Sequence, residues 1–387
     1  MKIEPYKINI AQSVLDDLQK RLKRTRWTDQ EESMGWEQGT NLKYLKELTQ
    51  YWMQEYDWRK EEEKLNAFSW YQAGIDGKTV KFIYEKGKGK NPTPLILFHG
   101  WPDSVMRFVR LIPMLTDPEK HGGHPDESFD VVVPHFIGGF SDQPEAPSSS
   151  EIKDIAEAGW KLMTEGLGYE KFVAGGGDGG SPISQIIAAE HPESIIALYL
   201  NDIGWHTNMV DRSNLSEAEL QYLQTIDYSG YSEGAYAMLQ GTKPQTLGMV
   251  LNDSPVGMAA WIVEKFRTWS DCDGDIENRY SKDEILTNIM LYWHKNSVRS
   301  FSYKEEFVSP SIRPDQQVNV PVALGLSPND INPLPPREFA ERTLTNIKHW
   351  NVMPHGGHFL AMEFPELMAQ DMREFFKPRL RIRIDKW

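Results

Sequence analysis

The segment that decides the fold is Phe172-Val-Ala-Gly-Gly-Gly-Asp-Gly-Gly-Ser-Pro-Ile183. An apolar run leads into a glycine cluster that carries one carboxylate, Asp178, and a helix-compatible segment from Ser184 to Glu190 follows. This order predicts a strand, a sharp turn and a helix. A side chain at the apex of such a turn projects from the sheet edge, and small neighbours let strand and helix approach closely.

The pattern Gly176-Gly-Asp-Gly-Gly180 matches the nucleophile elbow of α/β-hydrolases, with aspartate where esterases carry serine. A carboxylate nucleophile forms an ester, which suits attack on a saturated carbon that bears a leaving group. Two other interpretations remain open. Gly175-x-Gly-x-x-Gly180 also satisfies the dinucleotide fingerprint, although a carboxylate would repel the pyrophosphate. The segment could also be a glycine turn with a solvated aspartate.

Composition limits the class of protein. The 387 residues with 40% hydrophobic content can form one large domain with insertions or two smaller ones. The net charge of -14 argues against nucleic-acid and anionic-membrane partners. Cys272 is the only cysteine, which excludes an intrachain disulfide and favours a reducing compartment. The N-terminus lacks a signal-peptide pattern and no apolar run could span a bilayer, so we expect a cytoplasmic protein.

Short apolar runs alternate with helix-length polar segments along much of the chain. This alternation predicts βαβ units and a mainly parallel central sheet flanked by helices. Residues 207–310 interrupt it with helical patterns and are expected to form a helical lid between two core segments, 94–206 and 311–387. Residues 1–93 are expected to form a helical extension that packs on the core. The strand-like runs are 79–84, 94–98, 129–134, 172–174, 195–200 and 321–326, and a closing helix is expected over 367–376.

An acid and a histidine follow Asp178 in the order that this fold requires. Asp330 comes just after the run 321–326, and His358 comes just before the closing helix. A histidine near its usual pKa of about 6.5 can take a proton from water, and a carboxylate can orient it. The spacing of His355 and His358 is also compatible with a metal site. No third ligand is evident, so no metal or cofactor is expected.

Taken together, these residues resemble the epoxide hydrolases of the microsomal and juvenile-hormone type, including their soluble bacterial relatives. The resemblance covers essentially the whole chain. It implies an N-terminal family-specific domain wrapped on an α/β-hydrolase core with a helical lid. Its motifs are Arg26-Trp27, Gly35-Trp-Glu-Gln-Gly-Thr40, His99-Gly-Trp-Pro102, Gly176-Gly-Asp178, Lys243-Pro-Gln-Thr246, Asn252 to Phe266 and Pro354-x-Gly-Gly-His-Phe-x-Ala-x-Glu363.

The resemblance also implies two lid tyrosines that donate protons to an epoxide oxygen. The matching positions are Tyr236 and Tyr303, while Tyr222 and Tyr231 are nearby alternatives. An alkoxide leaving group is strongly basic, so an acid with a pKa of about 10 must share a proton with it as the ring opens. Each tyrosine taken alone is typical of core packing.

With this resemblance, the residues imply a two-step hydrolysis of a small apolar epoxide to a diol. Asp178 attacks an epoxide carbon, and water activated by His358, which Asp330 orients, then hydrolyses the ester. Backbone N–H groups of Trp101 and Gly179 are expected to bind the oxyanion. The turn that presents Trp101 is formed by His99, Gly100 and Pro102, and His99 itself is interpreted as structural. A monomer or homodimer is expected.

The sequence departs from the family pattern at two places. Gly179 stands where the family usually has tryptophan directly after the nucleophile, which retains the N–H and removes an aromatic wall. Ile137 precedes Gly138-Gly-Phe140 where the fold usually has proline. Neither departure removes a catalytic group.

Other functions remain open at this point. A haloalkane dehalogenase uses the same aspartate, acid and histidine, but normally has an indole N–H beside the nucleophile, which Gly179 cannot supply. A noncatalytic hydrolase-fold protein that binds an apolar ligand is a second alternative. A serine or cysteine hydrolase is disfavoured, since Ser181 lies past the apex and Cys272 lies in the insertion. The segment Asp271 to Asp275 is interpreted as a solvated loop, because its glycine position does not fit a calcium loop.

Overall fold

The computed structural model describes residues 1–137, 152–205, 207, 212–297, 300, 302–303 and 316–384. The segment Gly138-Gly-Phe140 lies outside these residues. Within them, nine strands form one sheet in the order β1-β2-β3-β5-β4-β6-β7-β8-β9. The first three strands in this order are antiparallel and β3 joins β5 antiparallel, whereas every further neighbour pairs in parallel. The predicted α/β-hydrolase class with a mainly parallel sheet is therefore confirmed.

The central strands are the apolar runs of the sequence. Every residue of β4, β5, β6 and β8 is buried, as expected for parallel strands covered on both faces. The strand bounds are β1 Ile3–Pro5, β2 Trp70–Ile75, β3 Lys78–Glu85, β4 Thr93–Phe98, β5 Phe129–His135, β6 Phe172–Gly176, β7 Ile195–Leu200, β8 Val322–Leu326 and β9 Ile347–Val352.

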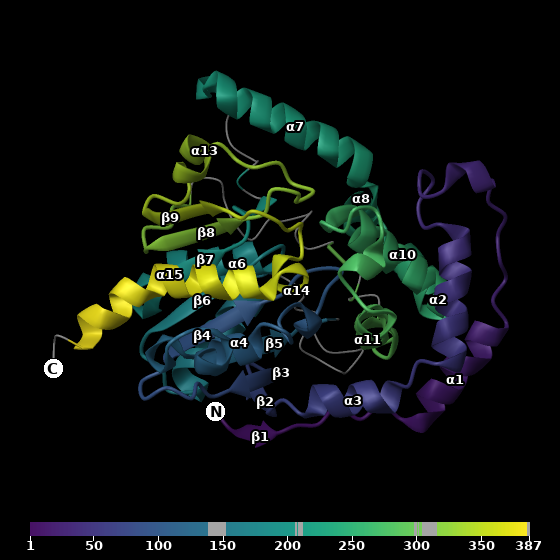
Figure 1. Cartoon of the computed structure of the whole chain (residues 1–387), viewed down its shortest axis with the longest axis horizontal. Helices are drawn as coiled ribbons and strands as arrows, with labels where there is room; N and C mark the ends of the chain where they lie inside the picture. Colours follow the sequence, from purple (N-terminus) through teal and green to yellow (C-terminus); the bar gives the residue numbers. More distant parts are fainter. Residues whose placement is uncertain are drawn as a thin grey trace.

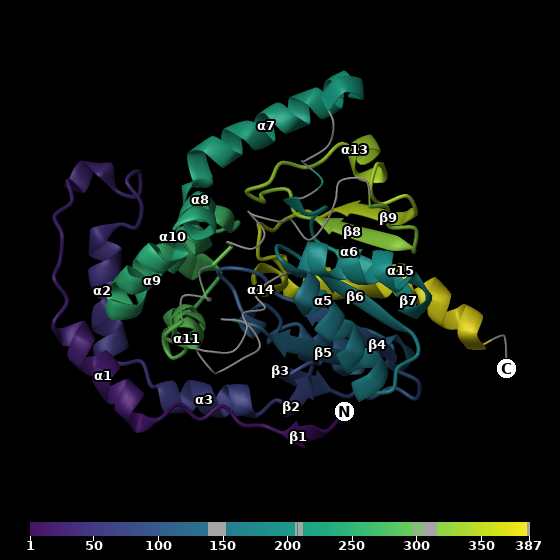
Figure 2. The same ribbon diagram turned by 180° about the vertical axis from the view of Figure 1, so that it is seen from behind.

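Helices cover both faces of this sheet (Figures 1 and 2). On one face lie α4 (Ile112–Thr116) and α15 (Pro365–Ile384), and on the other lie α5 (Ile152–Lys161) and α6 (Gly180–Glu190). Alternate residues of β4 belong to different cores: Leu95 and Leu97 pack in one apolar cluster, and Ile96 and Phe98 in the other. Two short helices are α13 (Arg337–Glu341), between β8 and β9 in the chain, and α14 (Leu360–Glu363), which follows β9 and contacts α15.

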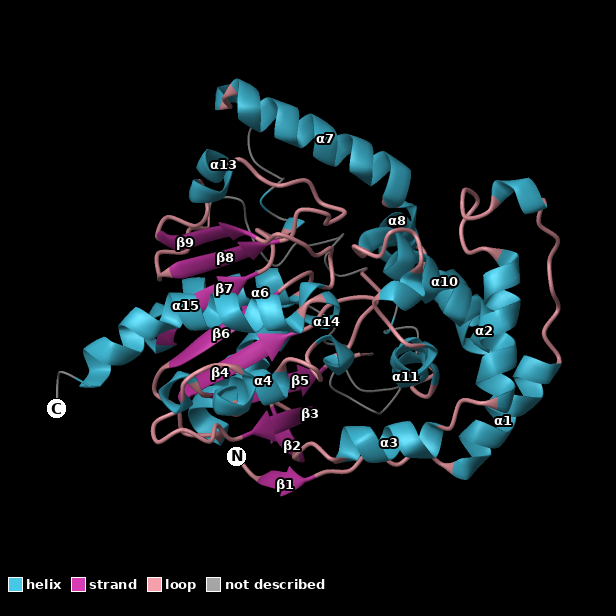
Figure 3. Cartoon of the chain, viewed as in Figure 1, coloured by secondary structure: helices cyan, strands magenta, loops and turns pink. Residues whose placement is uncertain are grey.

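The helices between β7 and β8 are called the lid helices below. Helices α8, α10 and α11 lie beyond the carboxyl ends of the parallel strands, and α7 runs from α8 to α13 (Figure 3). Their first helix begins at the capping box that Ser216 and Glu219 form with each other's backbone N–H groups. No helix of the described residues is both long and apolar enough to cross a bilayer. The helices are α7 Glu217–Glu233, α8 Ala235–Thr242, α9 Pro244–Asp253, α10 Pro255–Trp269 and α11 Lys282–Trp293.

The N-terminal helices pack against these same lid helices, whereas the N-terminal strands join the sheet (Figure 1). Helices α1 (Gln12–Lys23) and α2 (Leu42–Gln54) contact α10, and α2 and α3 (Trp58–Asn66) contact α11. Polar contacts accompany this packing. They include Arg21 Nη1 to Asp253 Oδ1 at 2.7 Å, Tyr51 Oη to Asp283 Oδ1 at 2.9 Å, and Tyr56 Oη to Thr287 Oγ1 at 3.1 Å.

The close approaches of α6 to β4 and of β6 to β7 require specific glycines. A Cβ on Gly180 would lie 2.0 Å from the backbone oxygen of Phe98, and one on Gly175 would lie 2.3 Å from that of Tyr199. A Cβ on Gly179 would meet nothing closer than 3.6 Å.

Helix α6 begins at Gly180, earlier than the segment 184–190 expected from the sequence, because residues of the turn form its first turn.

Substitution at these two neighbouring glycines separates backbone crowding from a general effect of added bulk. Gly180→Ala is expected to destabilise the protein by at least about 2 kcal/mol, because the new methyl meets backbone that cannot move aside. Gly179→Ala is expected to change the free energy of unfolding by less than about 1 kcal/mol. Urea denaturation of both variants measures this, and equal destabilisation would contradict the packing described.

Candidate active site

Asp178 occupies the apex of the turn between β6 and α6. Its φ angle of +55° lies in the left-handed region, which costs a non-glycine residue about 1–3 kcal/mol and needs support from its surroundings. Part of that support comes from Asp202, which follows β7 and accepts a hydrogen bond of 2.7 Å from the Asp178 N–H. The other oxygen of Asp202 accepts a hydrogen bond from the N–H of Gly204. The loop after β7 thereby fixes the elbow.

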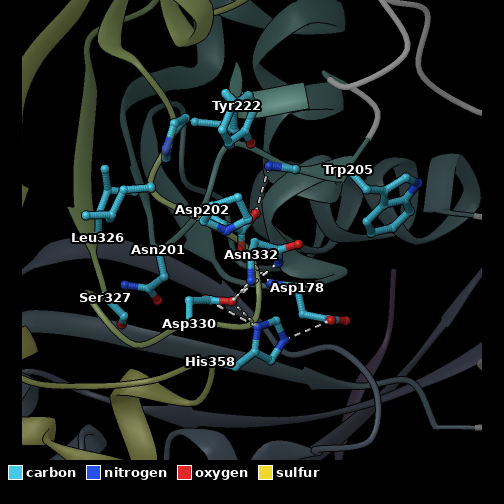
Figure 4. A pocket seen from close by; sticks show the side chains of 15 residues that line it. Asp178, Asn201, Asp202, Trp205, Tyr222, Leu326, Ser327, Asp330, Asn332 and His358 are labelled. Carbon is cyan, nitrogen blue, oxygen red and sulfur yellow. Dashed lines mark hydrogen bonds and ion pairs between the residues drawn. The ribbon is translucent and has the colours of Figure 1, made fainter. Parts of the chain in front are cut away.

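The two carboxylate oxygens of Asp178 have different partners. Oδ1 accepts hydrogen bonds from the backbone N–H groups of Trp101, at 3.0 Å, and Gly179, at 2.6 Å. Oδ2 lies 3.0 Å from Nε2 of His358. On the far side of that imidazole, Nδ1 lies 3.1 and 3.3 Å from the two oxygens of Asp330 (Figure 4). The structure thus brings together the three residues of the predicted triad and both predicted N–H donors.

The charges of Asp330, His358 and Asp178 stabilise one another and shift the pKa values of His358 and Asp178. Burial alone would lower the pKa of His358, but the carboxylates of Asp330 and Asp178 raise it well above its usual value. Burial would raise the pKa of Asp178, yet its hydrogen bond and ion pair with His358 and the N–H of Trp101 lower it. The resting site therefore holds an imidazolium between two carboxylates.

The turn after β4 is shaped so that its backbone can reach Asp178. A Cβ on Gly100 would lie 2.0 Å from Oδ1 of Asp178, so only glycine permits this approach. The Gly100 N–H donates to Asp103, and Asp103 forms a fully buried ion pair with Arg107. Arg107 also donates to the backbone oxygen of His358 at 3.2 Å. One buried ion pair thereby ties this turn to the histidine loop.

Within the described part of the chain, His99 and Pro102 form no hydrogen bond with the side chains of Asp178, Asp330 or His358. His99 stacks on Phe136, with ring centroids 3.9 Å apart, and burial lowers its pKa. Its Nδ1 lies 3.0 Å from the backbone oxygen of Gly100. Pro102 accepts a hydrogen bond from the side chain of Asn288 in α11. These contacts agree with a structural role for the His99–Pro102 turn.

The lid places aromatic rings beside the Trp101 side chain. Tyr236 in α8 stacks on Trp101 with centroids 4.8 Å apart, and Tyr303 lies edge-on to both rings. Burial raises the pKa of each tyrosine, and the negative charge of Asp178 raises it further. Both phenols therefore stay protonated and can donate. Trp269 completes this aromatic group, with its ring 5.1 Å from that of Tyr236.

The two alternative tyrosines lie elsewhere. The side chain of Tyr231 is 89% exposed. Tyr222 is buried in α7 and lies near Asp202 and Asp330, on a different wall of the site (Figure 4). His355 also stands apart from the triad, because its ring lies against Phe364.

Sequence reasoning missed the residues that hold the histidine loop. Glu363 accepts hydrogen bonds from the N–H groups of Gly357 and Phe359, which flank His358, and from the N–H of Asp271. Asp271 in turn accepts a hydrogen bond of 2.9 Å from the Gly356 N–H. The interpretation of the loop 271–275 as merely solvated is therefore wrong at its first residue. Glu363 could have been suspected from the motif that contains it, whereas nothing in the sequence indicates the role of Asp271.

Comparison with known proteins connects this geometry to a family. Residues 3–108 match the family model described as the epoxide hydrolase N terminus, and residues 93–307 match that of the alpha/beta hydrolase fold. The chain is 38% identical to a putative epoxide hydrolase of Stigmatella aurantiaca (strain DW4/3-1), over 97% of this chain and 85% of that protein. It is 35% identical to epoxide hydrolase 1 of Sus scrofa, over 96% of this chain and 88% of that protein.

Solved structures agree with this match. The juvenile hormone epoxide hydrolase of the silkworm Bombyx mori superposes with a TM-score of 0.82 at 29% identity, covering 98% of this chain and 94% of that one. The epoxide hydrolase of Aspergillus niger gives a TM-score of 0.82 at 26% identity, covering 98% of this chain and 97% of that one.

The support that Glu363 gives to the histidine loop can be tested by removing one acceptor. In Glu363→Gln the amide NH₂ cannot accept, so at least one buried N–H loses its partner, at a cost of about 1–3 kcal/mol. We expect a lower urea midpoint and a lower kcat, because His358 is no longer held in place. Glu366→Gln, at an exposed position of α15, is the matched control and should leave both unchanged. A Glu363→Gln variant with normal stability and kcat would contradict this role.

Proposed function

Because this chain belongs to the epoxide hydrolase family, we propose that it opens an apolar epoxide to a vicinal diol through a covalent ester on Asp178. The observation that carries the proposal is the environment of the Asp178 carboxylate. One oxygen is held by two N–H donors and the other faces His358, which Asp330 supports from behind. The aromatic rings beside Trp101 suit an apolar substrate.

In the first half of the reaction, Oδ2 of Asp178 attacks an epoxide carbon and the ring C–O bond breaks. Attack by the carboxylate is favoured because its depressed pKa keeps it ionised. The developing alkoxide accepts hydrogen bonds from Tyr236 and Tyr303 and takes a proton from one of them. Phenols beside the nucleophile serve a basic alkoxide better than a halide, which favours epoxide opening over dehalogenation.

In the second half, water hydrolyses the ester. Ester formation removes the charge of Asp178, so His358 loses one of the two carboxylates that raise its pKa. The imidazolium then gives up its Nε2 proton, which restores the tyrosine, and the neutral imidazole becomes a base. It takes a proton from water, and the hydroxide adds to the ester carbonyl carbon. The oxyanion forms on Oδ1, where the N–H groups of Trp101 and Gly179 already point. Collapse expels the diol alkoxide, which takes the proton of the new carboxyl group. Asp178 is then ionised again beside the imidazolium of His358, as in the resting site.

A single-turnover reaction in heavy-oxygen water tests this route. With enzyme in excess over styrene oxide, the label is expected in the Asp178 carboxylate and not in the diol, because the diol oxygen comes from the unlabelled carboxylate. Mass analysis of the diol and of the peptide that carries Asp178 measures this. His358→Gln is expected to accumulate the ester. Label in the diol with an unlabelled peptide would mean that water attacks the epoxide directly, and release of halide from a haloalkane would favour the dehalogenase alternative.

The two steps are expected to depend oppositely on pH. Ester formation needs ionised Asp178, whose pKa is lowered, so its rate constant should stay constant from about pH 8 to about pH 5 and fall only at lower pH. Ester hydrolysis needs neutral His358, so its rate constant should rise with pH and then level off. Rapid-quench measurement of both rate constants tests this. An ester-formation step that declines as pH falls through about 6.5 would contradict it.

A further inference from the structure

The side chain of Gln240 in α8 is fully buried. Gln240 follows Tyr236 by four residues, so the two side chains lie on the same face of this helix. The backbone oxygen of Gln240 accepts a hydrogen bond of 3.1 Å from the N–H of Tyr303. Gln240 therefore links the backbone at Tyr303 to the helix that carries Tyr236.

One hydrogen bond fixes the direction in which the amide of Gln240 points. Its Oε1 accepts a hydrogen bond of 3.0 Å from Nε1 of Trp261 in α10. An indole nitrogen can only donate, so its partner must be the amide oxygen, and the NH₂ group must point elsewhere. That group is buried, and Nε2 has no hydrogen-bond partner in the part of the chain that the structure describes. A buried donor without an acceptor is costly and calls for a role that the resting site does not show.

The amide of Gln240 acts on the phenol oxygen of Tyr303. Burial raises the pKa of Tyr303, and a negative charge on Tyr236 or Asp178 raises it further. The side chain of Gln240 has the opposite effect and lowers this pKa. An N–H donor near the phenol oxygen shifts the pKa in this direction, because it stabilises the phenolate. The NH₂ group of Gln240 therefore faces an oxygen that must share or give up a proton when the epoxide opens.

We propose that Gln240 is a positioning residue for ring opening, whose NH₂ group donates to the phenol oxygen of Tyr303 and so directs the Tyr303 hydroxyl toward the epoxide oxygen. The inference deepens the proposed function and rests on it. A phenol hydroxyl turns about its C–O bond to suit its neighbours, so a donor on one lone pair of the oxygen leaves the hydroxyl to donate elsewhere. This hydrogen bond is expected to tighten as negative charge develops on the phenol oxygen. The ring C–O bond breaks and a phenol proton passes to the alkoxide, while no bond within Gln240 breaks.

This role is confined to the first half of the reaction. The tyrosines act on the alkoxide that ring opening produces, whereas ester hydrolysis depends on His358, Asp330 and the two backbone N–H groups that hold the oxyanion. A residue that only supported the packing of the lid would affect both halves or the stability alone. Separate measurement of ester formation and ester decay therefore distinguishes the two roles.

Two variants remove the proposed donor in different ways. Gln240→Met keeps the length of the side chain without its amide, and Trp261→Phe keeps the amide without the indole N–H that orients it. Rapid-quench mass analysis of the Asp178 peptide with styrene oxide gives the rate constants of both steps. We expect Gln240→Met to form the ester at least about tenfold more slowly and to hydrolyse it within about twofold of the wild-type rate. Trp261→Phe should show the same selective effect, smaller in size. Gln50→Met, at an exposed position of α2, is the control and should change neither step.

Combination with tyrosine variants separates this role from lid packing. Tyr303→Phe has no phenol oxygen to receive the donor, so adding Gln240→Met to it should slow ester formation by less than about twofold more. In Tyr236→Phe the addition should keep its full effect. Should Gln240→Met fail to fold in urea denaturation, Trp261→Phe combined with the same tyrosine variants decides the question. Unchanged ester formation, an equal fall in both steps, or a full effect in Tyr303→Phe would overturn the role of Gln240. Absence of any ester on the wild-type enzyme would instead overturn the proposed function, and the role of Gln240 with it.

Discussion

The site depends on burying an alternating row of charges. His358 lies within hydrogen-bond distance of the carboxylates of both Asp330 and Asp178. The imidazolium is buried, and the two carboxylates are largely buried. A charge in such a position is tolerated only when opposite charge and N–H donors surround it. The buried pair of Asp103 and Arg107 extends the alternation to the turn after β4. The need to pair each buried charge therefore holds together the Asp178 elbow, the turn after β4 and the loop that carries His358.

The central strands could be predicted because a strand that is buried on both faces is a short run of apolar residues in the sequence. The strand β7 has the predicted bounds, and β4, β5 and β8 differ from theirs by one residue at one end, since all four are short apolar runs. The strand β9 was missed, because Ile347–Val352 is only partly buried at the sheet edge and contains polar residues that mimic a loop. The strand β2 was also missed, since its alternation depends on pairing with β1 and β3.

The residues of the site also fall into those that could be predicted from the sequence and those that could not. Asp178, Asp330 and His358 could be found because the fold fixes their order along the chain and the glycine cluster marks the first of them. The supports Asp202 and Arg107 could not be found, because they act through backbone groups that only the folded chain brings near. A carboxylate that accepts N–H bonds has no sequence pattern of its own. The aspartate that opens the loop 271–275 is the clearest case, since it belongs to the lid and holds the core.

The N-terminal helices are attached to the lid rather than to the sheet. Arg21, Tyr51 and Tyr56 each form a polar contact with a lid residue more than 200 positions away. Two distant stretches of the gene therefore encode one contact surface. If recombination between two relatives exchanged only the lid, the lid of one protein would pack against the N-terminal helices of the other. The two sides of this contact would then come from sequences that had evolved separately. Chimeras built to alter substrate preference should accordingly inherit both stretches from the same parent.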